Sequence, residues 1–278
     1  MKTIKSIFSA TASVMFLLCV SSCILFMSCK SADKDSVWSE EAEKPYKGRK
    51  IEKSVRSYIY KKNVSLFPGA EYAIYHFDYD VELPEKGFPE DVLRVMRQNI
   101  LSLVFGKTIR NADWDNVVYS NVDYLVAGWK RDHQEDYRDE FNSDYDSPMM
   151  EERDYIKGRM LDPYNGIVSY VCDSYGPGYN SYKRSVNMDV NTGRIIHESS
   201  LFRPGYRQIL RDLLMEYLPE RIDKQYVGSL REFQPSECFY VTKEGITYIY
   251  PQGEIGSMAD GVVEVTIPWD AFTLLRVK

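Results

Sequence analysis

The sequence predicts an α+β protein with two small antiparallel sheets, each packed with at least one long helix. Segments that alternate apolar and polar side chains occur in pairs joined by short turns, which is typical of hairpins. Segments with helical periodicity are few and long, and they do not alternate regularly with the strand-like segments. This order favours α+β over a doubly wound α/β fold.

The N-terminus is expected to direct export. Lys2 and Lys5 precede an apolar run from Ile7 to Met27, which is the layout of a signal peptide. The end of the run resembles a bacterial lipoprotein signal, in which a small residue precedes the cysteine that becomes lipidated. We expect residues 1–29 to be this signal, with Cys29 as the lipidation site. Cys23 is the alternative site, and an uncleaved membrane helix is the alternative structure, because about 20 apolar residues span a bilayer.

Three further segments follow the signal. Residues 30–50 are polar, rich in lysine and glutamate and aperiodic, so we expect a flexible tether. The composition changes near residue 147, which predicts an N-terminal α+β domain over 51–147 and a C-terminal one over 148–278.

The charge of the chain restricts its partners. Loss of Lys2 and Lys5 would leave 33 basic and 41 acidic residues, a net charge of −8. This disfavours nucleic acid and anionic lipid surfaces, because phosphate binding needs a basic surface. We therefore expect contact with a membrane only through the N-terminal lipid, and the charge suits a cationic partner.

The N-terminal domain contains two predicted strands and two predicted helices. Alternation over 51–60 and 70–83 predicts the strands, and in the second strand it places His76 and Asp78 on one face and Tyr75 and Tyr79 on the other. Pro89, early acidic residues and a terminal Gly106 delimit an amphipathic helix. Residues 113–142 continue with helical periodicity.

The C-terminal domain is predicted to be mostly strands. A turn at 163–166 joins strands over 151–162 and 167–176, and a third strand covers 181–190. A helix begins after Pro204, and strands at 238–250 and 262–272 complete the chain. Cys172 and Cys238 lie in these strands, either as a disulfide or as small buried side chains.

No catalytic motif accompanies these elements. His76, His133 and His197 are far apart in the chain, and no metal-ligand or nucleophile motif surrounds them. We expect no enzyme activity, no cofactor and no metal; the alternative is a cell-wall glycan or peptide hydrolase with unidentified acidic residues. The carboxylates of 132–146 predict a solvated helix end or a docking face, for which we name Asp132, Glu135, Asp136 and Asp139.

Residues 165–278 resemble the extracellular domain shared by RsiV-type lysozyme-sensing anti-sigma factors and PdaC-type peptidoglycan deacetylases. The resemblance rests on Tyr175-Gly176, the segment NMDVNTGRII, the helix LFRPGYRQILRDLL and the strands FYVTKEGITYIY. The closing motif is Tyr250, Glu254-Ile255, Ala259, Gly261 and Val265-Thr266-Ile267-Pro268.

The resemblance implies a binding domain for lysozyme-like cationic proteins or peptidoglycan. Tyrosine suits such a face, since it offers a large contact area at low rotamer entropy. The candidate ligand contacts here are Tyr175, Tyr179, Tyr250 and Glu254. Gly176-Pro177-Gly178-Tyr179 replaces the Gly-Gly-Ala-His turn of the family, so no role of that histidine is carried over. We expect neither sigma-factor binding nor deacetylase activity, and we predict a non-enzymatic, extracytoplasmic binding lipoprotein.

Overall fold

The computed structural model describes residues 54–66, 73–134, 150–176, 180–230, 233–273 and 275, and these contain two β-sheets and four α-helices. The predicted signal peptide, its cysteines and the tether lie outside the described residues. The α+β class is confirmed.

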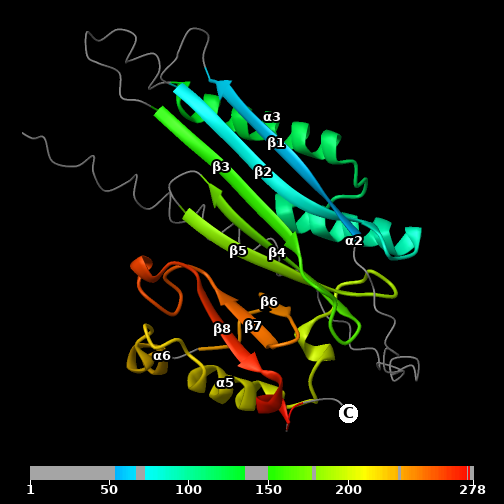
Figure 1. Cartoon of the computed structure of the whole chain (residues 1–278). Coiled ribbons are helices and arrows are strands. Elements are labelled where there is room, and N and C mark those ends of the chain that lie inside the picture. The colour runs from blue at the N-terminus through cyan, green and yellow to red at the C-terminus, as the bar shows by residue number, and fades with distance from the viewer. Residues whose placement is uncertain are drawn as a thin grey trace, which may run out of the picture. The chain divides into compact units, whose positions relative to one another are not determined.

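The first sheet has five strands in the order β1-β2-β3-β4-β5 (Figure 1). The strands are β1 (Ser54–Ser65), β2 (Ala73–Lys86), β3 (Met150–Met160), β4 (Ile167–Gly176) and β5 (Asn180–Asp189). Neighbours pair antiparallel except β2 and β3, which are parallel. A parallel pair needs a crossover, and here the crossover contains both long helices of the N-terminal half.

These two helices pack on one face of the five-stranded sheet (Figure 1). Helix α2 (Glu90–Phe105) ends at Gly106, whose φ of 63° is accessible to glycine at little cost. Helix α3 (Trp114–Asp132) begins at Asp113, whose side chain accepts a hydrogen bond from the Asn116 N–H at 3.2 Å. The strand alternation of β2 turns one set of side chains towards these helices, namely Ala73, Tyr75, Phe77, Tyr79, Val81 and Leu83.

The second sheet is smaller and has the order β6-β7-β8. Its strands are β6 (Phe239–Val241), β7 (Gly245–Tyr250) and β8 (Val263–Pro268). Helices α5 (Tyr206–Glu216) and α6 (Lys224–Ser229) contribute to its core, which is separate from the first. Short 3-10 helices η3 (Glu198–Ser200), η4 (Met258–Asp260) and η5 (Trp269–Phe272) complete this half. In β8 the side chains of Val263, Val265 and Ile267 face the core.

The two sheets meet through buried polar side chains rather than through a shared ladder. Ser169 on β4 and Asn187 on β5 are 0% and 3% exposed. The Asn187 Nδ2–H donates to the Phe239 carbonyl at 2.7 Å, and the Val241 N–H donates to Ser169 Oγ at 2.9 Å. The first sheet thereby satisfies the free edge of β6, which would otherwise be buried without partners.

Two parts of the predicted architecture are corrected. The pairing of β2 with β3 is parallel, so the first sheet is mixed and not purely antiparallel. The predicted boundary at 147/148 would divide the five-stranded sheet, because β1 and β2 precede it and β3, β4 and β5 follow it. Strands that share one continuous ladder and one core belong to the same folding unit.

Cys172 and Cys238 are free thiols. Cys172 is buried under the helices of the first sheet, and Cys238 lies between the two sheets. Among the described helices, none is long and apolar enough to cross a membrane.

Candidate ligand-binding site

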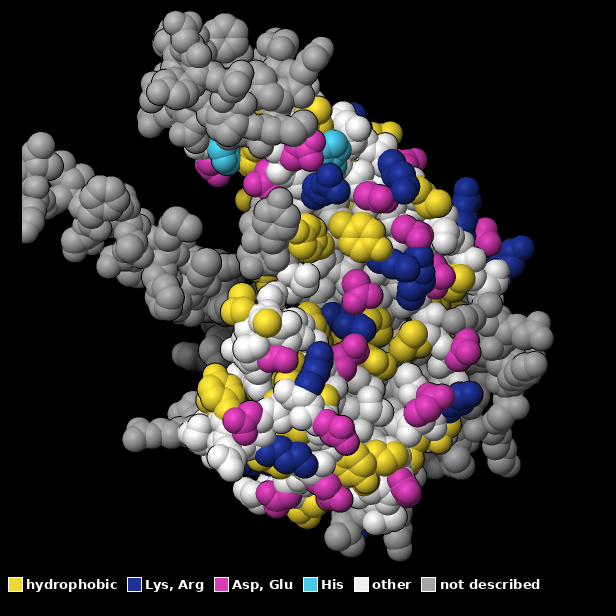
Figure 2. Space-filling model, turned by 60° about the vertical axis from the view of Figure 1, so that its left-hand side comes forward, with side chains coloured by type: hydrophobic (Ala, Val, Ile, Leu, Met, Phe, Trp, Pro, Cys, Tyr) yellow, Lys and Arg dark blue, Asp and Glu magenta, His cyan; other side chains and the backbone are white. Residues whose placement is uncertain are grey.

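One face of the five-stranded sheet carries no helix over β1, β2 and β3, and we call this the open face. The strand register places Lys61 and Asn63 beside Asp78 and His76, and these lie beside Tyr155 and Arg153. All of them point away from α2 and α3 because successive strand residues alternate in direction. Figure 2 shows basic and acidic side chains interspersed over the molecule, so the visible surface is not a field of one sign.

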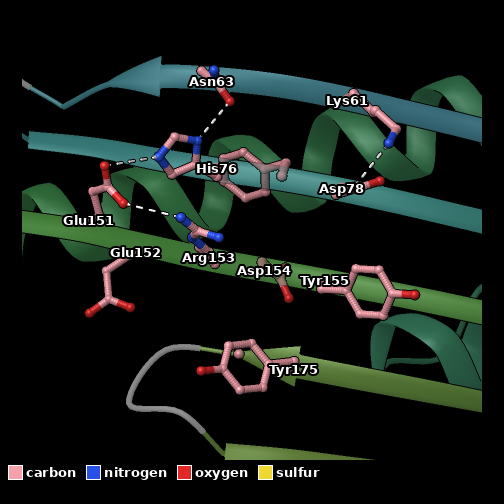
Figure 3. Close-up of a pocket in the computed structure, with 12 residues that line it drawn as sticks. Lys61, Asn63, His76, Asp78, Glu151, Glu152, Arg153, Asp154, Tyr155 and Tyr175 are labelled. Carbon is pink, nitrogen blue, oxygen red and sulfur yellow. Dashed lines mark hydrogen bonds and ion pairs between the residues drawn. The ribbon is translucent and has the colours of Figure 1, made fainter.

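A pocket of about 690 Å³ lies on the open face, where β3 extends beyond the end of β4 (Figure 3). We call it the tyrosine pocket. Its lining comes from four strands and consists of Lys61, Asn63, His76, Phe77, Asp78, Glu151, Glu152, Arg153, Asp154, Tyr155, Tyr175 and Gly176. Its volume is in the range of small-molecule sites.

His76 links two strands across the upper part of this pocket. Its Nδ1 lies 2.9 Å from Asn63 Oδ1, and its Nε2 lies 3.9 Å from Glu151 Oε1. Because an amide oxygen only accepts, the Nδ1 carries the proton in this contact. The Nε2 is buried and has no hydrogen-bond partner within the described residues.

Four of the charged side chains of the pocket form two ion pairs, and the carboxyls of Glu152 and Asp154 also line it. Lys61 Nζ lies 3.0 Å from Asp78 Oδ2, and Arg153 Nη2 lies 3.3 Å from Glu151 Oε2. Figure 3 shows both pairs along the sheet surface. Since each basic group already faces a carboxylate, these pairs offer a ligand hydrogen-bonding groups more than a net charge.

Two aromatic rings complete the wall of the pocket. Tyr155 on β3 and Tyr175 on β4 are register partners, and Figure 3 shows both rings standing at the same end of the pocket. Cross-strand partners on one face have Cβ atoms about 4.5–5.5 Å apart. Tyr155 is 37% exposed, so its ring is accessible from solvent.

Asp154 is the carboxyl of the pocket with a raised pKa. Burial raises the pKa of Asp154, while the hydrogen bond from Tyr79 and the charge of Arg184 act in the opposite direction. The Tyr79 hydroxyl donates to Asp154 Oδ2 at 2.5 Å. The same burial raises the pKa of the Tyr79 phenol, so both groups form a buried pair beneath the sheet surface.

A second cavity of about 850 Å³ lies beside β5 and the smaller sheet. Glu254 lines this cavity, and burial raises the pKa of its carboxyl. The two carboxyls Asp154 and Glu254 thus belong to different cavities. In the described part of the chain, no group of three or more His, Cys, Asp or Glu side chains could hold a metal ion.

The predicted site residues are not brought together. Tyr175 lines the tyrosine pocket and Glu254 the second cavity. Asp132 is exposed at the end of α3, and its Oδ1 lies 3.4 Å from Arg131 Nε. Glu135, Asp136, Asp139 and Tyr179 lie outside the described residues.

Tyr250 is corrected from a ligand contact to a core residue. Its side chain is 0% exposed, stacks on Phe233 at 5.9 Å between ring centroids and donates from its hydroxyl to the Gln234 carbonyl at 3.3 Å. All six residues of β7 are buried, so alternation did not distinguish inner from outer positions there.

Most of the tyrosine pocket was not anticipated. The alternation of 70–83 placed His76 and Asp78 on one face, which was the available signal. The strand that lies beside β2 on this face could not be predicted, because β3 pairs with β2 only after a long crossover.

Comparison with known proteins finds similarity to one protein family. Residues 199–270 match the family model described as "Protein of unknown function (DUF3298)". A crystal structure of a DUF3298 family member from Bacteroides fragilis is similar, with a TM-score of 0.71 and 20% identity, covering 82% of this chain and 95% of that one. A DUF3298 family protein from Pseudomonas aeruginosa has a TM-score of 0.51 and 13% identity, covering 83% and 97%. No curated protein matches the chain. The coverage far exceeds the matched segment, so the fold similarity includes the five-stranded sheet.

Proposed function

The chain carries a DUF3298 domain over residues 199–270, and from this premise we propose that it is a non-enzymatic binding protein of the bacterial cell envelope that takes a cell-wall glycan in the tyrosine pocket. The observation that carries the proposal is the pair of tyrosines, Tyr155 and Tyr175, beside a row of polar side chains in one cavity.

The chemistry of the pocket suits a sugar. The C–H face of a pyranose packs against an aromatic ring, and its hydroxyl and acetamido groups need donors and acceptors around its edge. Tyr155 and Tyr175 supply the rings, and Asn63, His76 and Arg153 supply polar edges in the same cavity. A few placed polar groups beside aromatic surface are typical of sites that orient a small ligand.

The ion pairs favour a neutral polar ligand over a cationic protein. A lysozyme-like partner would need carboxylates free to pair with its basic residues, whereas Asp78 and Glu151 already face Lys61 and Arg153. A lysozyme-like ligand remains the second candidate because of the net negative charge and the acidic run at 132–146. It would bind away from the tyrosine pocket.

Binding is favoured over hydrolysis by the positions of the carboxyls. Glycoside hydrolysis uses two carboxyl groups on either side of one bond, one of them with a raised pKa. Asp154 is engaged by the buried Tyr79 hydroxyl, and Glu254 lines a different cavity. A glycan in the tyrosine pocket would meet two rings, two ion pairs and the Glu152 carboxyl, while Asp154, whose pKa is raised, is held by Tyr79.

We place the protein outside the cytoplasm, held to the membrane by a lipid on Cys29. In a bacterial host grown with labelled palmitate, the wild type and Cys23→Ala should incorporate the label, whereas Cys29→Ala should not. Labelling of Cys29→Ala together with loss of labelling in Cys23→Ala would show that the lipid is attached to Cys23.

Co-sedimentation with purified cell-wall sacculi tests the ligand class. The wild type should sediment with sacculi, and Tyr155→Ala should lower the affinity by about tenfold, since an aromatic anchor contributes on the order of 1–2 kcal/mol. Tyr124→Ala is the matched control, because Tyr124 is an exposed tyrosine of α3 outside the pocket. Equal sedimentation of both variants would show that the glycan does not bind in the tyrosine pocket. Shortening of the glycan strands would support the alternative that the protein is a hydrolase.

A further inference from the structure

The outer edge of β5 carries backbone groups that point away from the sheet. Strand β5 pairs with β4 on one side only. The Val190 N–H donates towards β4, to the Gly166 carbonyl at 2.9 Å. In an antiparallel ladder the direction alternates with each residue, so Lys183, Ser185 and Asn187 direct their N–H and C=O groups outwards.

One end of this edge already receives another segment of the chain. The Ile196 N–H donates to the Asn187 carbonyl at 2.8 Å, and the Asp189 N–H donates to the Arg194 carbonyl at 2.9 Å. After Ile196 the chain turns away into η3. Within the ranges that the structure describes, no backbone group pairs with the outward side of Lys183 and Ser185, and the contact there is from the Cys238 thiol, which lies 3.8 Å from the Lys183 carbonyl.

The remaining edge lies in a groove, which we call the β5 groove. It consists of the 850 Å³ cavity and an adjoining one of about 370 Å³, and both are lined by Arg207 and Glu237. Residues 182–187 of β5 run along both cavities, a length of roughly 17 Å at about 3.4 Å per residue. Figure 1 shows β5 at the edge of its sheet, next to the smaller sheet.

Three carboxylates and three basic side chains line the groove, namely Glu198, Glu237, Glu254, Lys183, Arg184 and Arg207. Lys183 is occupied elsewhere, since its Nζ lies 2.9 Å from Glu264 Oε2 and 3.7 Å from Asp173 Oδ1. Arg184 is also directed elsewhere, since its Nη2–H donates to the Val104 carbonyl of α2 at 3.1 Å, which leaves Arg207 beside the three carboxylates.

We propose that the β5 groove binds an extended peptide with basic side chains, which adds to β5 as a sixth strand. Spaced N–H and C=O groups along a strand edge are matched by the backbone of another extended chain. The cavities beside Lys183 and Ser185 leave room for that chain, and the three carboxylates complement lysine or arginine side chains. The site is distinct from the tyrosine pocket, so it adds a peptide ligand to the proposed glycan.

Hydrogen–deuterium exchange on the full-length protein in detergent tests this site. The probe is an acetylated and amidated heptapeptide of alternating valine and lysine. It should slow exchange at the Lys183 and Ser185 amides by about tenfold or more, because a strand partner protects both. The same peptide N-methylated at every residue, which has no internal N–H to donate along either edge, should give no protection.

Charge variants separate the groove from general attraction. Glu237→Lys should weaken binding of the lysine peptide by about tenfold, and Glu220→Lys, an exposed acid outside the groove, should leave it unchanged. An alternating valine–glutamate peptide should bind more weakly than the lysine peptide.

Three outcomes would overturn the proposal. The first is unchanged exchange at Lys183 and Ser185 with saturating lysine peptide, and the second is equal binding of the N-methylated peptide. The third is protection that rises with protein concentration when no peptide is present, because the edge would then serve a second copy of the chain.

Discussion

Ser169 and Val241 belong to different sheets and are joined through one hydroxyl group. The Val241 N–H donates to Ser169 Oγ at 2.9 Å, and the hydroxyl proton faces Asn187 Oδ1 at 2.7 Å and the Val241 carbonyl at 3.0 Å. Both side chains are buried, so these contacts replace the water that a strand edge would otherwise bind. The hydroxyl therefore attaches the small sheet to the large one.

Loss of this hydroxyl should weaken folding. Ser169→Ala leaves the Val241 N–H buried without its acceptor, which should lower the free energy of unfolding by about 1–3 kcal/mol. Ser174→Ala, on the same strand with a longer contact of 3.5 Å to the Tyr182 carbonyl, should change it by about 0.5 kcal/mol or less. Denaturant unfolding measures both. Equal effects of the two variants would mean that the buried hydroxyl has no special role.

Gly245 should not tolerate a side chain. A Cβ at this position would lie 2.1 Å from the Ile267 carbonyl oxygen on the neighbouring strand, and backbone atoms cannot rotate away. Gly245→Ala should therefore lower the free energy of unfolding by about 1–3 kcal/mol. Gly176→Ala meets nothing within 4 Å and serves as the control. A neutral Gly245→Ala in thermal or denaturant unfolding would contradict the close approach of β7 and β8.

Asp154 should make stability depend on pH. Burial raises the pKa of this carboxyl in the folded state, so the folded protein holds the proton more tightly than the unfolded chain. As the pH rises from about 3.9, the ordinary carboxyl pKa, through the raised value, ionisation lowers the free energy of unfolding of the wild type.

Asp154→Asn cannot ionise and keeps an acceptor for the Tyr79 hydroxyl. It should therefore gain stability over the wild type across that pH window, and the gain should vanish at lower pH. Urea unfolding between pH 3.5 and 7 measures the difference, with the exposed Asp132→Asn as control. An advantage of Asp154→Asn that grows towards acid would have the wrong sign and would reject the buried pair.

Cys172 and Cys238 should stay unpaired, and the Cys172 thiol should be unreactive in the folded protein. Burial raises the pKa of the Cys172 thiol to about 12, and burial also raises the pKa of Cys238. Because the thiolate is the reactive form, native Cys172 should resist alkylation at pH 8. After denaturation without reductant both thiols should be alkylated, as counted by intact mass. Alkylation of both only after reduction would demonstrate a disulfide.

The sequence predicted the elements better than their partners. Alternation in 70–83 correctly separated the buried Tyr75 and Tyr79 from the outward His76 and Asp78, because one face of β2 packs on helices and the other is open. Gly106 correctly marked the end of α2. Periodicity is a local property, so these features were accessible from short windows.

The pairing of β2 with β3 was not accessible in this way. Their partners lie 77 positions apart, as in Ala73 and Met150, and meet only because α2 and α3 return the chain to the same sheet. The tyrosine pocket depends on this parallel pair, so its composition could not be read from any one segment. Tyr250 was misplaced because a strand buried on both faces has no alternation to reveal its inner side.

The most direct test of the proposed function is to detect contact between a defined glycan and the rings of Tyr155 and Tyr175. Saturation-transfer NMR with a soluble disaccharide–peptide fragment of peptidoglycan should transfer magnetisation to the sugar ring protons in the wild type. Transfer should be lost in Tyr155→Ala and kept in Tyr124→Ala. Undiminished transfer in Tyr155→Ala, or none in the wild type at millimolar fragment, would contradict glycan binding in the tyrosine pocket.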